Sequence, residues 1–133
     1  MDWKLELVPV PVSDVDRAKR FYSEQLGFVV ALDDQPTESI RIVQLTPAGS
    51  ACSIMLGAGT DSVPGSLQGL QLVVSDIEAG RAELVARGVE CGPIRHFADG
   101  GWVEGKGGPW NAFVSFSDPD GNGWVIQERP ADT

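Results

Sequence analysis

The sequence predicts an α+β fold made of two tandem βαβββ modules, and three observations point to it. The segment VPVSDV at residues 10–15 recurs as LVVSDI at residues 72–77, nearly half the chain later. Each copy leads into an amphipathic segment that ends at a glycine, Gly27 in the first half and Gly88 in the second. Between the halves, residues 58–67 are rich in small and turn-forming residues and have no apolar period, which is typical of a linker.

Each copy of the repeated segment is expected to start a helix. Ser13 and Ser75 can accept the free backbone N–H groups of a first helical turn, so we predict that they are the N-caps. Asp14 and Asp76 follow them, where a negative charge favours the helix dipole. Apolar side chains or stems then recur at three- and four-residue spacing, at Val15, Ala18, Phe21, Tyr22 and Leu26 and at Ile77, Arg81, Leu84 and Val85. The glycine that follows can take the left-handed conformation that closes each helix.

The remaining apolar segments are predicted to be strands, because they are short and bounded by turn formers. They lie near residues 28–32, 40–45 and 51–56 in the first half and near residues 69–74, 89–94, 112–116 and 124–128 in the second. We expect a single domain over residues 1–133, made of module 1–57, linker 58–67 and module 68–133. One helix covers only one face of a sheet, so two modules that face each other would form a curved open barrel around a cavity.

Charge and composition narrow the classes of partner. Of 133 residues, 19 are acidic and 10 are basic, and the net charge of -9 would repel nucleic acid and anionic membranes. The first residues lack a signal-peptide pattern, and no apolar stretch reaches the roughly 18 residues of a spanning helix. Cys52 and Cys91 are isolated, so we interpret them as free thiols. We expect a cytoplasmic protein that binds neither nucleic acid nor membranes.

Several stretches together carry a resemblance to a known family. They are residues 12–15 leading to residues 21–22 and 26–27, residues 74–77, and the ending FSDPDGNGW at residues 116–124. In their order and spacing they resemble the vicinal oxygen chelate superfamily, which includes glyoxalase I, extradiol dioxygenases, fosfomycin-resistance enzymes and bleomycin-binding proteins. The resemblance spans nearly the whole chain. It implies the glyoxalase/bleomycin resistance/dioxygenase-like fold, with a small-molecule ligand in the cavity.

Metal-using members of that superfamily carry His, Gln or Glu at four cavity positions. The resemblance places these positions at Leu7, Gly69 and Val125, with the fourth at Ser53 or Met55. A divalent ion of this kind needs three or four convergent oxygen or imidazole ligands, which these residues do not supply. The chain is thus identified as a member that lacks the usual metal ligands.

Three other potential ligands lie away from those positions. Strand alternation turns Glu6 and Glu128 away from the cavity, because each neighbours an inward position. His96, the only histidine, falls in the polar stretch after the sixth strand. We therefore predict that the chain holds no metal and needs no cofactor.

Counting by twos along the expected strands predicts an apolar cavity with two amides. The inward residues are Leu7, Pro9 and Pro11, then Gly69, Gln71 and Val73, then Gly123, Val125 and Gln127. Gln71 and Gln127 can donate and accept hydrogen bonds, which suits orienting a polar ligand, unless each bonds only to neighbouring backbone or water. Val125, Met55 and Gln44 are further candidate ligand contacts. Gln44 could face either side, since no motif fixes the register of its strand.

Residues 95–110 form a long glycine-rich stretch with two tryptophans, and long loops inside compact domains are often functional. Trp102 and Trp110 are candidate ligand contacts, because they could close over an aromatic or cationic ligand through stacking or cation–π contact. The alternative is that these rings fix the loop to the core.

Two prolines stand in the opening strand, at Pro9 and Pro11. Proline cannot donate to a sheet ladder and is confined to edges or bulges. This strand is therefore expected at a free edge or across to a partner, and superfamily members commonly pair modules between chains. We expect a homodimer.

The function predicted from these features is metal-independent binding of a small molecule, in drug or metabolite sequestration. The alternative is a glyoxalase- or dioxygenase-like enzyme, in which an ion polarises vicinal oxygens of the substrate. A metal-free enzyme that uses Glu104 or His96 as acid or base is a third possibility. No residue is assigned a catalytic role.

Overall fold

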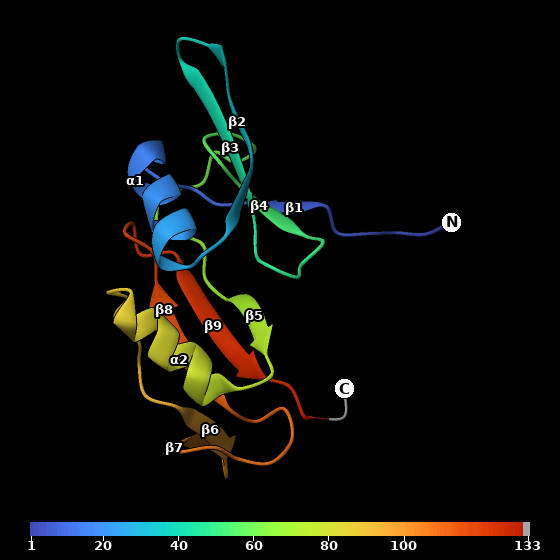
Figure 1. The fold of residues 1–133 in the computed structure, drawn as a ribbon, viewed down its shortest axis with the longest axis vertical. Coiled ribbons are helices and arrows are strands. Elements are labelled where there is room, and N and C mark those ends of the chain that lie inside the picture. Colours follow the sequence, from blue (N-terminus) through green and yellow to red (C-terminus); the bar gives the residue numbers. More distant parts are fainter. Residues whose placement is uncertain (132–133) are drawn as a thin grey trace. The chain divides into compact units, whose positions relative to one another are not determined.

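The computed structural model describes residues 1–131 and contains two β-sheets, each with a helix packed against it (Figure 1). Unit 1 consists of residues 1–67 together with residues 118–122, and unit 2 of residues 68–117 and those from 123 on. The predicted α+β class is confirmed, with two open sheets of four and five strands. The division of one domain into modules 1–57 and 68–133 stays a prediction. No helix within residues 1–131 is long and apolar enough to cross a membrane.

Unit 1 is built on a sheet of strand order β1-β4-β3-β2. Its elements are β1 (Leu7–Pro9), α1 (Val15–Arg20), the π-helical turn η1 (Phe21–Gln25), β2 (Val29–Thr37), β3 (Ile40–Thr46) and β4 (Ser53–Leu56). β1 runs parallel to β4, while β3 is antiparallel to both β2 and β4. α1 packs on β3 and β4. The buried core of the unit includes Val10, Ala18, Phe21, Tyr22, Phe28, Val43, Leu45, Ile54 and Leu56.

Unit 2 is built on a sheet of strand order β5-β9-β8-β6-β7. Its elements are β5 (Leu70–Val74), α2 (Ile77–Ala86), β6 (Arg95–Ala98), β7 (Gly101–Glu104), β8 (Phe113–Ser117) and β9 (Gly123–Glu128). β5 is parallel to β9, and α2 packs on β8 and β9. The buried side chains are Ile77, Leu84, Val89, Ala112, Val114, Phe116, Trp124 and Ile126. Since strand residues alternate in facing, this leaves the other face of the sheet open.

The N-caps of both helices lie one residue later than the predicted serines, at Asp14 and Asp76. The Asp14 carboxylate accepts the backbone N–H of Arg17, and the Asp76 carboxylate accepts that of Ala79, each at 3.0 Å. The prediction of Ser13 and Ser75 as caps was therefore wrong. In the first copy the serine hydroxyl has other partners, because it donates to Asp120 and its oxygen accepts from Arg17 Nη2.

The two glycines expected to close the helices do take the left-handed conformation. Gly27 has a φ of 75° and Gly88 a φ of 86°, a region that residues with a Cβ rarely adopt. After Gly88 the backbone N–H of Val89 returns to the carbonyl of Leu84 at 2.9 Å. Both helix ends were correctly predicted from glycine position.

The strand predicted over residues 89–94 is absent, and the next strand begins at Arg95. Pro93 has no N–H to donate, and the segment keeps single ladder-like bonds such as Gly92 N to Ser115 O at 2.9 Å. A hairpin of β6 and β7 instead occupies part of the stretch predicted as a loop over residues 95–110. Its turn is Asp99-Gly100, with φ of 51° and 80°, and Asp-Gly with both φ positive is a strong hairpin signal.

β1 is an edge strand, as its proline suggested. Pro9 pairs with Met55 of β4, and the strand ends there. Pro11 is therefore not part of the strand; it is buried, and its carbonyl accepts the backbone N–H of Gly65 at 3.2 Å. The inward count along this strand was wrong for Pro11, because the ladder stops two residues earlier.

Candidate ligand-binding site

The open face of the unit 2 sheet carries most of the candidate ligand contacts. Registered partners on neighbouring strands point to the same side, so Val73, Gln127, Phe113 and Arg95 form one row across four strands. Gln71, Val125 and Ser115 form the next row. The buried residues Val114, Phe116, Trp124 and Ile126 alternate with these and lie on the side of α2. We call the outward rows, with the aromatic residues described below, the open face.

The two predicted amides bond to each other and then to the loop. Gln71 Nε2 donates to Gln127 Oε1 at 2.6 Å, and Gln127 Nε2 donates to the backbone carbonyl of Trp110 at 2.7 Å. The structure therefore brings Gln71, Gln127 and Trp110 together. The Gln71 and Gln127 amides are therefore already paired within the chain. Each still has an N–H group or an oxygen lone pair that a ligand could use.

Trp110 sits in an unusual backbone conformation. Its φ is 63°, a left-handed value that costs about 1–2 kcal/mol for a residue with a Cβ. The loop around it is tied by backbone bonds from Gly107 N to Asn111 O at 2.8 Å and from Asn111 N to Gly108 O at 3.1 Å. The indole is nonetheless 45% exposed, so the loop presents this ring to solvent and does not bury it.

An ion pair between Lys106 and Glu128 holds the start of the same loop. The Glu128 carboxylate accepts the backbone N–H of Ile77 at 3.0 Å and lies 2.9 Å from Lys106 Nζ. The Ile77 N–H, and then Lys106, hold the pKa of Glu128 below its usual value, while Glu128 raises the pKa of Lys106. Since Ile77 is the first residue of α2, Glu128 points to the helix side, as strand alternation predicted.

A cluster of three aromatic rings lies on the β6–β7 hairpin and β8. The Trp102 ring is edge-on to Phe97, with centroids 5.5 Å apart, and to Phe113, with centroids 5.6 Å apart. The Arg95 guanidinium lies over Trp102, 4.3 Å from the ring centroid. Phe97 and Trp102 are about half exposed, at 51% and 50%. Sequence reasoning missed Arg95, Phe97 and Phe113, although the Asp-Gly turn would have paired Phe97 with Trp102.

Asn111 supports this hairpin with its side chain. Its Oδ1 accepts the backbone N–H of Phe97 at 2.9 Å, and its Nδ2 donates to the carbonyl of the same residue at 2.9 Å. One amide thus satisfies both backbone groups of Phe97, as a neighbouring strand would. The hairpin and the Trp110 loop are joined through this residue.

Gln44 and Met55 lie in unit 1, where they are registered partners on β3 and β4. The neighbours of Gln44 along β3, Val43 and Leu45, are fully buried on the side of α1. Gln44 therefore lies on the open side of its sheet, which fixes the register that the sequence left undetermined. It is half-buried, and Leu32 of β2 is its other registered partner.

Two hollows in unit 1 involve the predicted linker. One has a volume of about 430 Å³ and is lined by Ile40, Gly57, Ala58, Gly59, Thr60 and Asp61. The other, of about 110 Å³, is lined by Val10, Pro11, Val12, Gly57, Ala58, Thr60 and Ser62. Neither contains a predicted ligand contact. No aromatic side chain lines either hollow, which does not favour an aromatic ligand.

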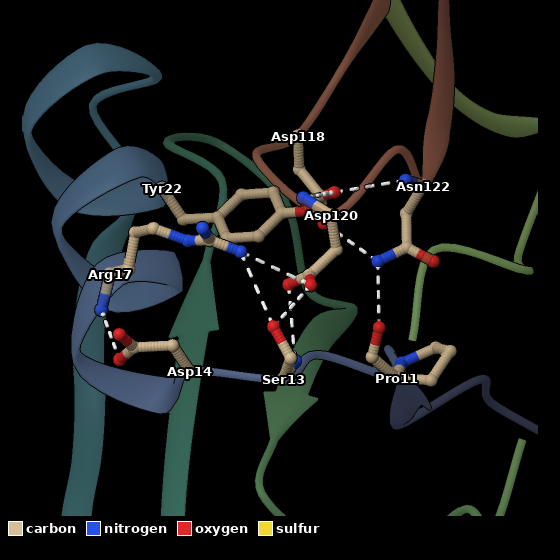
Figure 2. Close-up of polar contacts among 8 residues, drawn as sticks. All are labelled: Pro11, Ser13, Asp14, Arg17, Tyr22, Asp118, Asp120 and Asn122. Atoms are coloured by element: carbon tan, nitrogen blue, oxygen red, sulfur yellow. Dashed lines mark hydrogen bonds and ion pairs between the residues drawn. The ribbon is translucent and has the colours of Figure 1, made fainter. Parts of the chain in front are cut away.

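The titratable groups gathered near the start of α1 form a structural clasp (Figure 2). Tyr22 donates its hydroxyl hydrogen to Asp118 Oδ2 at 2.7 Å, and Asn122 Nδ2 donates to the same oxygen at 2.8 Å. The other oxygen, Oδ1, accepts backbone N–H groups of Asp120 at 3.0 Å and of Asn122 at 2.9 Å. All three side chains Tyr22, Asp118 and Asn122 are buried. A carboxylate with four donors and no exposed edge is suited to holding a turn, not to proton transfer.

Ser13, Arg17 and Asp120 form the rim of this clasp. Asp120 Oδ1 accepts from the Ser13 hydroxyl and lies 3.2 Å from Arg17 Nη2. Asn122 Nδ2 also donates to the carbonyl of Pro11 at 2.8 Å, behind the rim. These bonds tie the turn at residues 118–122 to the segment that leads into α1.

The positions that the resemblance assigns to metal ligands do not fit a metal ion. In unit 1, Leu7 is registered with Ser53, and the Ser53 hydroxyl is paired with that of Thr46 at 2.7 Å. In unit 2, Gly69 and Val125 have no side-chain donor. Across residues 1–131, no three His, Cys, Asp or Glu side chains gather closely enough to hold an ion.

The two candidate acid–base residues are not brought together. His96 is registered with Val103, so Glu104, the next residue, points to the opposite face of the hairpin. His96 Nδ1 is 2.9 Å from the carbonyl of Gly105. No acid–base pair for a metal-free reaction is formed by these residues.

Comparisons with known proteins agree with this fold. TnmS3, an antibiotic binding protein from Streptomyces sp. CB03234, is 37% identical, covering 96% of this chain and 97% of that chain, with a TM-score of 0.77. A glyoxalase/bleomycin resistance protein from the same strain is 38% identical, covering 93% of this chain and 99% of that chain, with a TM-score of 0.73. A superfamily member from Sphaerobacter thermophilus DSM 20745 is 28% identical, covering 96% and 98% of the two chains, with a TM-score of 0.77.

No curated protein matches the sequence significantly. The sequence model of the Glyoxalase/Bleomycin resistance protein/Dioxygenase superfamily matches residues 4–126, nearly the whole chain. This agrees with the resemblance derived from the repeated segments and with the two open sheets. The chain therefore belongs to the Glyoxalase/Bleomycin resistance protein/Dioxygenase superfamily.

Proposed function

We propose that this protein binds a small organic molecule, an antibiotic or metabolite, and sequesters it without a metal ion or cofactor. The observation that carries the proposal is the open face of unit 2, where Phe97, Trp102 and Trp110 are each about half exposed. Clustered exposed aromatic rings mark a binding surface, because leaving them in water forgoes the stabilisation of burial. Neighbouring rings hold Trp102, and a hydrogen bond to its backbone holds Trp110, so these side chains lose little freedom when a ligand binds.

The relatives support binding over catalysis. TnmS3, at 37% identity, is named an antibiotic binding protein. A glyoxalase- or dioxygenase-like reaction would need an ion at the superfamily positions, and here Leu7, Gly69 and Val125 offer no donor. A metal-free reaction would need a paired acid and base, whereas His96 and Glu104 lie on opposite faces of their hairpin. Binding requires neither.

The proposal is tested by ligand binding with matched tryptophan variants. We expect bleomycin, tetracycline or doxorubicin to raise the melting temperature of the protein, since a ligand that binds the native state stabilises it. Trp110→Ala should weaken the binding of the responding drug by about tenfold, the loss expected for removing one aromatic contact. Trp3→Ala is the control, because Trp3 is 87% exposed and belongs to unit 1.

Metal content is measured on the same preparation, purified without chelator. Metal well below one ion per chain, with binding that persists in chelator, is the expected result. A tightly held ion at one per chain would contradict metal independence. Equal drug affinity of the Trp110→Ala and Trp3→Ala variants would contradict binding at the open face of unit 2. If no drug raises the melting temperature, that result would count against sequestration.

We also propose that the protein is a homodimer in the cytoplasm. β2 is an edge strand whose residues are all exposed, and apolar side chains at Val29, Val30 and Leu32 face water there. An apolar edge of this kind is suited to pairing with a second copy. Both cysteines are free, which agrees with a reducing compartment. Sedimentation at two concentrations tests the dimer, and a monomer throughout would refute it.

A further inference from the structure

Arg95 occupies a distinctive place on the open face. It lies on β6, registered with Phe113, and its guanidinium stacks over the Trp102 ring at 4.3 Å from the centroid. The side chain is half-buried. A cation bound by Trp102 from solution would compete for the ring with a cation that the chain already supplies.

This guanidinium has no acidic partner within residues 1–131. Glu104 is its registered neighbour on β7, yet no ion pair joins the two side chains. Within the same residues the Arg95 side chain makes no hydrogen bond either, and it contacts the Trp102 ring. By contrast, carboxylate or carbonyl oxygens hold Arg17, Arg41, Arg81 and Arg87.

An unpaired, half-buried arginine is unexpected in a chain with a net charge of -9. Burying part of a charge costs free energy unless an opposite charge or an acceptor compensates for it. The guanidinium contacts the Trp102 ring, and none of its five N–H groups donates a hydrogen bond within the described residues. Those N–H groups remain available to an oxygen atom from outside the chain.

We propose that Arg95 makes the open face select planar aromatic ligands that carry an anionic oxygen, a carboxylate or phenolate, over ligands that carry an ammonium group. The inference rests on the proposed function and names its ligand class. It also revises the sequence-based expectation that Trp102 and Trp110 contact a cationic ligand. Exposed acidic residues act through water and are screened beyond about 8 Å, whereas Arg95 acts in contact.

The neighbouring rings hold the charge in place. Phe97 and Phe113 each meet Trp102 edge-on, which restrains the indole on which Arg95 stacks. The same rings offer apolar surface to an aromatic ligand, since Phe97 and Trp102 are about half exposed. A flat molecule with an oxygen at its edge would meet both kinds of contact at once.

The test compares three probes of one shape and different charge: 2-naphthoate, 2-naphthalenemethanol and 2-naphthylmethylammonium. Dissociation constants are measured by calorimetry on the full chain at constant ionic strength. We expect 2-naphthoate to bind wild type at least about tenfold more tightly than the ammonium probe, the ratio that a charge-assisted hydrogen bond supplies. The neutral probe should lie between them.

Arg95→Gln should remove this preference while changing the affinity for the neutral probe by less than about threefold, since the aromatic contacts remain. Arg95→Lys keeps the charge but loses the planar, stacked guanidinium, so it should restore only part of the preference. Arg20→Gln is the matched control: it removes one exposed positive charge in unit 1, and all three constants should stay at wild-type values.

The failures are distinguishable. Equal binding of all three probes to wild type, or a preference that survives in Arg95→Gln, overturns the role of Arg95 and leaves aromatic binding standing. No binding of any probe to wild type overturns both this inference and the proposed function. Near-ultraviolet circular dichroism shows whether Trp102 keeps its environment in each variant, which separates loss of charge from loss of the ring cluster.

Discussion

Replacing Gln127 with leucine separates two roles for this amide: contacting the ligand, or positioning Trp110. Gln127 donates to the Trp110 carbonyl at 2.7 Å and accepts from Gln71 at 2.6 Å. Leucine keeps much of the volume on β9 and removes both bonds. Each is worth about 0.5–1.5 kcal/mol, and both are exposed, so the free energy of unfolding should fall by no more than about 2 kcal/mol.

The larger effect is expected on ligand affinity. Trp110 is held at a φ of 63°, and without the Gln127 bond its backbone is free to relax to a negative φ. The loss of one bond worth about 1 kcal/mol lowers the equilibrium constant for the held conformation about fivefold. If binding needs the indole in that conformation, the dissociation constant for 2-naphthoate should rise by up to about fivefold.

The assay is a double-mutant cycle with Gln127→Leu, Trp110→Ala and the double variant, each titrated with 2-naphthoate. Positioning predicts that Gln127→Leu weakens binding in wild type and has no further effect in Trp110→Ala. Gln71→Leu, which breaks only the bond between the amides, should have a smaller effect. Equal losses in both backgrounds would refute the reasoning and show that Gln127 contacts the ligand directly.

Three further predictions concern stability. Asn122→Ala loses two buried bonds of 2.8 Å, to Pro11 and to the Asp118 carboxylate, so urea unfolding should show a loss of about 3 kcal/mol, and a loss under about 1 kcal/mol would contradict the clasp. Glu128→Gln should be less stable than wild type at neutral pH, with a gap that closes as pH falls through the lowered pKa of Glu128; a pH-independent gap would refute this. Gly100→Ala meets no atom within 4 Å, so its φ of 80° alone should cost about 1 kcal/mol, and an unchanged melting temperature would argue against the strained turn.

Much of the fold was predictable because it depends on short-range chemistry. The glycines at the helix ends, the alternation along β9 and the edge position of β1 each follow from one or two residues and their neighbours. The serine caps were missed by one residue, since Ser and Asp are both good caps and the choice depended on Asp120, far along the chain. When a serine and an aspartate are adjacent before a helix, the sequence pattern shows that either can be the cap but not which one is.

The candidate site was predicted in part. Trp102, Trp110, Gln71 and Gln127 all lie in unit 2, and the two amides bond to each other and to the Trp110 loop. Arg95 was missed because a lone arginine between Ile94 and His96 carries no pattern. Its meaning comes from what surrounds it, a ring at 4.3 Å and no acidic partner in the described chain, and neither fact is local in sequence.

The clasp of Tyr22, Asp118 and Asn122 has a consequence for how the chain acquires its structure. Tyr22 and Asp118 are 96 residues apart, and Asn122 and Pro11 are 111 apart, yet both pairs belong to unit 1. During synthesis, α1 and the four strands beside it emerge long before the turn that completes their buried polar contacts. The first half of the repeat should therefore lack its bonds to Asp118 and Asn122 until nearly the whole chain has left the ribosome.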